Sequence, residues 1–104
     1  MIATAQTPPP PYYAVIFTSL RTDGDNDYAA TAAQMLEIAS QQPGFLGFES
    51  ARQEIGISVS YWASLEAIAA WKENIMHRKA QSRARDWYRQ FRVRICRVER
   101  EYGF

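Results

Sequence analysis

Blocks of alternating and periodic apolar residues predict four β-strands and two α-helices along the chain. The strand-like segments are residues 12–20, 45–52, 57–62 and 90–100, and the helix-like segments are residues 28–41 and 64–87. The resulting order is strand, helix, strand, strand, helix, strand. This order is the split β-α-β arrangement, so we predict an α+β, ferredoxin-like fold with two helices on one face of an antiparallel sheet.

The first strand is apolar at nearly every position from Tyr12 to Phe17. A strand that is wet on one face alternates, whereas a continuous apolar run indicates that both faces are covered. A domain of this length supplies helices for only one face of its sheet. We therefore expect a second copy of the chain on the other face, which predicts a homodimer formed through the sheet.

The third and fourth strands do alternate, so their side chains can be assigned to opposite faces of the sheet. Ile57, Val59 and Tyr61 share one face of the third strand, and Ser58, Ser60 and Trp62 share the other. In the fourth strand, Phe91, Val93 and Ile95 alternate with Arg92, Arg94 and Cys96. Val98 falls out of this phase, which predicts a β-bulge near the end of the strand.

Polar residues mark where the two helices begin and end. The side chains of residues 25–27 can cap the first helix, and the Gln-Pro-Gly sequence at 42–44 ends it. Ser64 is the expected N-cap of the second helix. A kink or a break is predicted at residues 72–75, because one apolar stripe gives way there to another. The two stripes are Ile68, Trp71 and Ile75, then Met76, Ala80, Ala84 and Trp87.

Length and composition indicate one domain, which we place at residues 12–104, preceded by a proline-rich arm at residues 1–11 that is flexible or lies along a neighbouring surface. The arm lacks the basic start and long apolar run of a secretory signal, and no segment is long enough to span a membrane. Cys96 is the single cysteine, so no internal disulfide is available and a reducing compartment is favoured. We expect a cytoplasmic protein without a membrane partner.

The formal net charge is +1, but the charges are unevenly spread. Residues 1–71 hold two basic and seven acidic side chains, whereas residues 72–100 hold ten basic and three acidic ones. A basic C-terminal third is typical of proteins that bind nucleic acid, an anionic ligand or a complementary subunit. The third strand has no basic residue and lacks the Arg/Lys-Gly-Phe/Tyr pattern of RNA-recognition strands, so no nucleic-acid partner is expected.

Several short motifs follow one another along the chain: Pro-Gly-Phe at residues 43–45, Tyr61-Trp62, Ser64-Leu65, Trp71 and His77. In this order and spacing, residues 12 to 100 resemble the antibiotic biosynthesis monooxygenase superfamily. The resemblance implies a dimeric α/β barrel, in which two sheets pack face to face, with a pocket between each sheet and its helices. Some members of the superfamily oxidise phenols or hydroquinones without a cofactor, others degrade haem, and many have no assigned activity.

The haem-degrading members combine an Asn on the first strand, a helix Trp, and a His about ten residues further on. Here the first strand has no Asn, the tenth residue after Trp71 is Gln81, and His77 follows Trp71 by only six residues. The resemblance therefore favours the cofactor-independent oxygenases, and neither a cofactor nor a metal is expected. Such an enzyme needs a base, a dry pocket and donors for a substrate anion, because triplet oxygen reacts slowly with closed-shell molecules.

His77 and Trp71 are the predicted catalytic residues. His77 is the only histidine and the natural base, although an exposed or capping histidine would also fit a basic helix. Trp71 is expected to stack on an aromatic substrate, or else to pack in the core. Predicted substrate contacts are Tyr61, Trp62, Tyr88, Arg85 and Phe17. Tyr61 and Trp62 point to opposite faces, so only one of them can face the pocket, and Arg85 alternatively belongs to a solvated basic surface.

The leading hypothesis is a cofactor-independent monooxygenase acting on a small aromatic, phenol- or hydroquinone-like substrate between helices and sheet. The alternative is a non-catalytic ligand-binding or interaction module of the same fold, favoured by the single histidine and the missing Asn. An isomerase or a decarboxylase is a third hypothesis, because a base in a dry pocket also serves those reactions.

Overall fold

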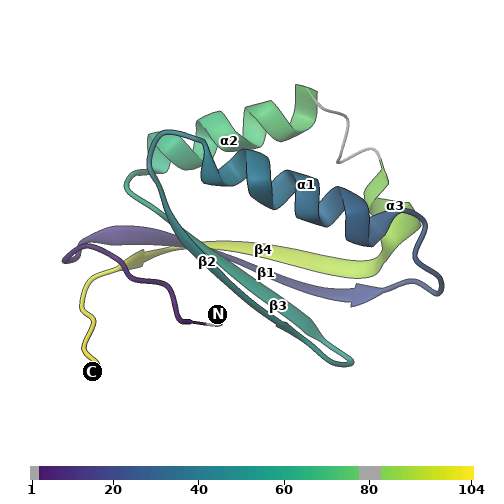
Figure 1. Cartoon of the computed structure of the whole chain (residues 1–104), viewed down its shortest axis with the longest axis horizontal. Coiled ribbons are helices and arrows are strands. Elements are labelled where there is room, and N and C mark those ends of the chain that lie inside the picture. Colours follow the sequence, from purple (N-terminus) through teal and green to yellow (C-terminus); the bar gives the residue numbers. More distant parts are fainter. Residues whose placement is uncertain (1–2, 78–82) are drawn as a thin grey trace.

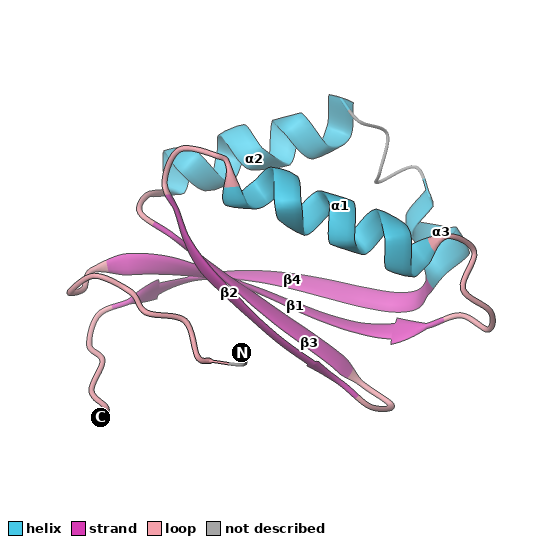
Figure 2. Ribbon diagram, in the orientation of Figure 1, coloured by secondary structure: helices cyan, strands magenta, loops and turns pink. Residues whose placement is uncertain are grey.

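The computed structural model describes residues 3–77 and 83–104, with only the backbone for Met76 and His77. Within these residues, four strands form one antiparallel sheet in the order β2-β3-β1-β4. The strands are β1 (Tyr12–Arg21), β2 (Phe45–Arg52), β3 (Gly56–Trp62) and β4 (Tyr88–Val98), and the helices are α1 (Tyr28–Ser40), α2 (Leu65–His77) and α3 (Ala84–Trp87). The helices lie on one face of the sheet (Figure 1, Figure 2). The predicted ferredoxin-like α+β fold is confirmed.

Strand register decides which side chains face the helices. Trp62 lies on the helix side, because its ring stacks on Trp71 of α2. The antiparallel pairing then places Tyr13, Val15, Phe17 and Ser19 of β1 on the same side, together with Phe91, Val93 and Ile95 of β4. The opposite side, which we term the open face, carries Ala14, Ile16 and Thr18, then Ile57, Val59 and Tyr61, then Arg92, Arg94 and Cys96. The alternation predicted for β3 and β4 is therefore confirmed.

The core is centred on Trp62, whose side chain is 0% exposed. Its ring meets Phe45 edge-on, with 5.4 Å between centroids, and stacks on Trp71 at 6.3 Å. The indole Nε1 of Trp62 donates a hydrogen bond of 2.9 Å to Ser60 Oγ, so the polar edge of the buried ring is satisfied. These contacts pin α2 and the start of β2 to the C-terminal end of β3.

The side chains that cap the two long helices are among those predicted from the sequence. The amide of Ala67 donates to Ser64 Oγ at 3.1 Å, which confirms Ser64 as the side-chain cap of α2. At α1, the amide of Ala29 donates to Asp25 Oδ1 at 3.3 Å. Asp27 is the N-cap by backbone position, with φ 66°, and its side chain makes no capping bond. Asp25 therefore provides the side-chain cap of α1.

Two predicted irregularities, a break in the second helix and a bulge at Val98, are wrong. The helix α2 runs without a break through residues 72–75. The predicted second stripe includes the Met76 side chain and Ala80, which lie outside the described residues. The bulge is not at Val98, which pairs in register with Tyr12. It lies at the other end of β4, where the chain passes directly from α3 into the strand and the pairing skips a residue.

The N-terminal arm lies along the open face, on the side of the sheet away from the helices (Figure 1). The Ala5 amide donates to Glu49 Oε2 at 2.9 Å, and the hydroxyls of Thr7 and Tyr12 both donate to Glu101 Oε2, at 2.9 and 2.6 Å. Tyr12 is consequently only 4% exposed. The chain itself thus covers one end of the open face, where the sequence had suggested a second copy.

No helix in the described part of the chain is long and apolar enough to cross a membrane.

Candidate functional site

An aromatic cluster occupies the helix side of the sheet where β1 ends and β4 begins. Phe17 lies edge-on to Tyr88, with 5.2 Å between centroids, and stacks on Phe91 at 5.5 Å. Tyr28, the first residue of α1, meets Tyr88 at 5.6 Å and Trp87 at 6.0 Å, both edge-on. Rings from β1, α1, α3 and β4 therefore converge, although they are distant in sequence.

Next to this cluster, β4 presents three apolar side chains to the helix side that the helices leave half uncovered. Phe91, Val93 and Ile95 are 48%, 47% and 53% exposed, and we term them the β4 strip. They are open because α1 lies against β2 and α2 lies against β3. Exposed apolar surface beside aromatic rings is a feature of ligand-binding sites.

The β4 strip connects the aromatic cluster with the Trp62 core. Phe91 pairs with Ser19, and Ile95 pairs with Val15, which in turn lies opposite Ser60 on β3. From Phe17 to Tyr13, four residues of β1 span about 13 Å at the usual rise of a strand. The apolar surface is thus long enough to accept a molecule with more than one ring.

Polar groups lie at the end of the β4 strip that borders the aromatic cluster. Arg52 Nη2 donates a hydrogen bond to Ser19 Oγ, and Ser19 is only 2% exposed. The guanidinium lies over Gly56, where any side chain would collide with it. Burial, and next a hydrogen bond with the Tyr28 hydroxyl, raise the pKa of Tyr88, while the nearby Arg52 and Arg21 charges lower it by less. The Tyr88 hydroxyl therefore keeps its proton at neutral pH.

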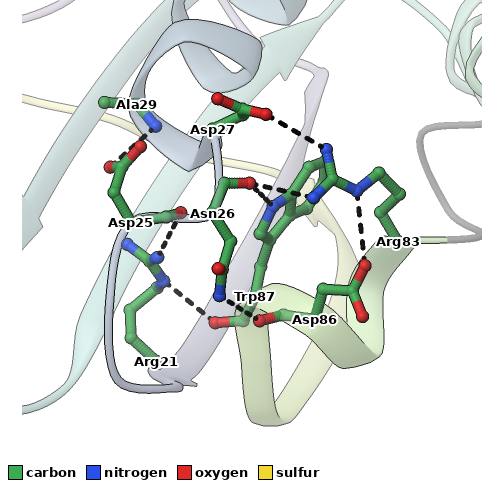
Figure 3. A network of polar contacts seen from close by, with 8 residues as sticks. All are labelled: Arg21, Asp25, Asn26, Asp27, Ala29, Arg83, Asp86 and Trp87. Atoms are coloured by element: carbon green, nitrogen blue, oxygen red, sulfur yellow. Dashed lines mark hydrogen bonds and ion pairs between the residues drawn. The ribbon is translucent and has the colours of Figure 1, made fainter.

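A polar network fixes the residues behind the cluster (Figure 3). Arg21 Nε donates to the Trp87 carbonyl at 2.9 Å, and the guanidinium carbon lies 3.5 Å from the centre of the Tyr28 ring. The carbonyl of Asn26 accepts bonds from Trp87 Nε1 at 2.9 Å and from Arg83 Nη2 at 3.0 Å. This network joins the turn before α1 to α3, and so sets the position of Tyr28 against the start of β4.

The predicted site residues fall in several places. Phe17 and Tyr88 lie together in the aromatic cluster. Trp71 and Trp62 form a second group, in which Trp62 is fully buried and Trp71 covers it. Arg85 is exposed on α3, apart from both groups. His77 is the last residue of α2, and its side chain lies outside the described residues.

Tyr61 lies on the open face, so of the Tyr61–Trp62 pair only Trp62 faces the helices. The Tyr61 hydroxyl donates to Glu49 Oε1 at 2.6 Å, and its ring meets Tyr12 edge-on at 5.9 Å. Burial, and next the bond to Glu49, raise the pKa of Tyr61 to about 12. Tyr61 thus belongs to the contact between arm and sheet rather than to the helix-side surface.

Several residues of the helix-side surface were not assigned to the site from the sequence. They are Tyr28, Ser19, Arg52 and the three residues of the β4 strip. Arg52 had a signal, since it and Arg21 are the two basic residues among the first 71. The sequence held no such signal for Tyr28, because only the conformation of the turn before α1 brings it into contact with Trp87 and Tyr88.

Within residues 3–77 and 83–104, no group of three His, Cys, Asp or Glu side chains is placed to hold a metal ion. The helix-side surface combines stacked rings, an apolar strip, tyrosine hydroxyl donors and a guanidinium. Such a set can bind an aromatic molecule and hold an oxyanion on it.

Comparisons with known proteins agree with this fold. The antibiotic biosynthesis monooxygenase family model matches residues 11–83. The uncharacterised Bacillus subtilis protein YqjZ is 45% identical over 103 residues, which cover 96% of this chain and 90% of YqjZ. A variant of SnoaB, a cofactor-independent oxygenase from Streptomyces nogalater, superposes with a TM-score of 0.76 at 9% identity, over 88% of this chain and 97% of SnoaB. PA3566 from Pseudomonas aeruginosa superposes with a TM-score of 0.68 at 10% identity, over 89% and 97% of the two chains. The chain belongs to the antibiotic biosynthesis monooxygenase family.

Proposed function

We propose that the protein is a cofactor-independent monooxygenase that oxidises a small phenol- or hydroquinone-like substrate on the helix side of its sheet. The observation that carries this proposal is the β4 strip, an apolar surface left half exposed beside the aromatic cluster. The shared fold with SnoaB, itself a cofactor-independent oxygenase, supports the same class of chemistry.

The proposed reaction needs no external reductant. A phenol loses its hydroxyl proton, and the electron-rich phenolate donates electrons to oxygen. At the para carbon, a C–H bond is replaced by C=O, the second oxygen atom leaves as water, and all four electrons come from the substrate. One phenol and one O2 thus give one quinone and one water, so the protein has to supply only a base, a dry site and donors.

The residues of the helix-side surface would divide these tasks. Phe17 and Phe91 would stack on the substrate ring, and the protonated Tyr88 hydroxyl would exchange its hydrogen bond with Tyr28 for one to the phenolate. His77 remains the predicted base. Trp71 packs on the buried Trp62, so it would form the wall at the end of the helix-side surface away from the aromatic cluster, rather than stack on the substrate ring.

A bulky substitution in the β4 strip provides the test. Ile95→Trp would fill the surface, whereas Ile55→Trp, in the β2–β3 turn, is a matched control because the two isoleucines are 53% and 54% exposed. Oxygen uptake with 1-naphthol, and formation of 1,4-naphthoquinone, should fall at least tenfold in Ile95→Trp and stay unchanged in Ile55→Trp. Equal activity of the two variants would remove the strip from the reaction, and no uptake by the wild type over a panel of naphthols and hydroquinones would reject the oxygenase assignment.

A ligand-binding module is the competing function. One observation favours it: neither the aromatic cluster nor the β4 strip includes a histidine or a carboxylate to act as base. Quenching of tryptophan fluorescence by 1-naphthol, without oxygen uptake and without an effect of His77→Ala, would support binding alone.

We also propose that a second copy of the chain covers the rest of the open face. Ile57 is 47% exposed there, and Ile16 and Val59 beside it are half-buried. Size-exclusion chromatography with light scattering should give twice the chain mass for the wild type and the monomer mass for Val59→Arg. A monomeric wild type at micromolar concentration would contradict this arrangement.

A further inference from the structure

Arg52, at the end of β2, is held on the helix side of the sheet by two features. Its Nη2 donates to Oγ of the buried Ser19, and Gly56 leaves the space into which the guanidinium fits. The strand pairing is consistent with this contact, since Arg52 and Ser19 are both paired with Gly56 and so lie on the same face of the sheet. The charged group of an otherwise exposed side chain is thus fixed at one place.

Within the part of the chain that the structure describes, no carboxylate forms an ion pair with Arg52. The ion pairs among the described residues join Arg83 to Asp27 and Asp86, and Arg52 takes part in none of them. A guanidinium carries five N–H donors, and the bond to Ser19 uses one of them. Arg52 therefore keeps most of its donors, and its whole charge, for a partner from outside the described residues.

The fixed guanidinium borders the aromatic cluster. Ser19 pairs with Phe91 and lies two residues from Phe17 on the same face, about 7 Å along the strand. Tyr88 lies there too, with its ring centroid 5.2 Å from that of Phe17, and the Arg52 charge lowers the pKa of Tyr88 against the larger effect of burial. A ring lying on Phe17 and Phe91 would thus lie close to both Arg52 and Tyr88.

We propose that Arg52, positioned by Ser19, forms with the Tyr88 hydroxyl the anion-binding end of the β4 strip, and that the ligand is a hydroxylated aromatic carboxylic acid. A carboxylate matches the flat, forked guanidinium with two parallel hydrogen bonds, whereas a phenol offers one oxygen and is mostly neutral at pH 7. The inference rests on the proposed function for the location of the site and specifies the substrate class that the site takes.

Binding of 1-hydroxy-2-naphthoate and of its neutral amide, measured by calorimetry without oxygen, tests the proposal. The wild type should bind the acid at least 10-fold more tightly than the amide, as a hydrogen-bonded charge requires. Arg52→Gln should abolish this preference by weakening the binding of the acid, and Arg52→Lys should keep part of it. Arg100→Gln, which removes the same charge beyond the far end of β4, is the control and should keep all of it.

The proposal is wrong if the wild type binds the acid and the amide equally, or if it binds neither. It is also wrong if Arg52→Gln, with the same unfolding midpoint as the wild type, still prefers the acid. Its failure is distinguishable from failure of the oxygenase assignment, because these titrations require no turnover. A preference for the acid that depends on Arg52, without oxygen uptake on any substrate, would leave this site standing and reject the oxygenase.

Discussion

Replacement of Gly44 by alanine should destabilise the fold through two separable effects. Gly44 lies in the turn between α1 and β2 with φ +86°, and its carbonyl accepts a hydrogen bond from the Ala63 amide at 2.7 Å. A Cβ added to Gly44 would lie 2.7 Å from the Cβ of Ala67 in α2. The first effect is the strain of a left-handed alanine, and the second is a collision between the turn and the helix that carries Trp71.

The free-energy cost of each effect can be estimated separately. A non-glycine residue in the left-handed region costs about 1–2 kcal/mol, and overpacking costs about 1–3 kcal/mol. Gly44→Ala should therefore lower the free energy of unfolding by about 2–5 kcal/mol. Gly24 supplies a matched control, because its φ is +78° and nothing lies within 4 Å of an added Cβ. Gly24→Ala should show only the backbone strain.

Urea unfolding followed by tryptophan fluorescence would measure these free energies, and Ala67→Gly would complete the cycle. In the wild-type background, glycine within a helix costs about 1 kcal/mol. In the Gly44→Ala background the same change removes the collision, so it should cost less or restore stability. If Gly44→Ala is no worse than Gly24→Ala, or if Ala67→Gly has the same effect in both backgrounds, the close approach of turn and helix is refuted.

Three further predictions concern the core, the open face and the network behind the aromatic cluster. Trp62→Ala should lower the free energy of unfolding, measured in urea, by about 3–5 kcal/mol, since it empties the centre of the core. A loss of less than about 0.5 kcal/mol, as is usual at exposed positions, would contradict the burial of Trp62. The hydrogen bond from Tyr61 lowers the pKa of Glu49 below 4.5, so this carboxylate stabilises the fold above pH 4.5 and the effect is lost as pH falls through the lowered value. Tyr61→Phe should thus be less stable than the wild type at pH 7, by a gap that narrows at pH 3; a constant gap would argue against the linkage. Trp87→Phe removes the donor to the Asn26 carbonyl and should lower the unfolding free energy by about 1 kcal/mol, and an unchanged urea midpoint would contradict it.

The sequence predicts the sheet well, because alternation is a local property that strand pairing then uses directly. Ile57, Val59 and Tyr61 face the open side, as their spacing requires, and Ser64 caps α2 as its position suggests. The bulge was misplaced because its position depends on a tertiary contact. The bulge arises where α3 passes directly into β4, and nothing in the spacing around Val98 records that junction.

The candidate site was predictable as a set of residue types but not as an arrangement. Phe17 and Tyr88 were chosen from the sequence and do meet, whereas Trp62 proves to be buried under Trp71. Tyr28 could not be found, since it joins the cluster only because the turn before α1 folds back against α3. Long-range packing of this kind leaves no periodic trace in the sequence.

The two arginines of the acidic N-terminal part show why charge alone could not locate the anion site. Arg21 and Arg52 both lie near Tyr88, and from the sequence they are equivalent. Arg21 donates to the carbonyls of Trp87, Gly24 and Asp25, and its guanidinium lies against the Tyr28 ring, so its hydrogen-bonding capacity holds the fold together. Arg52 has the bond to Ser19 alone among the described residues, and its remaining donors lie at the edge of an apolar surface. Since an unbalanced guanidinium beside exposed rings gains most from an anion attached to a ring, the arginine that contributes least to the fold is the one expected to recognise the ligand.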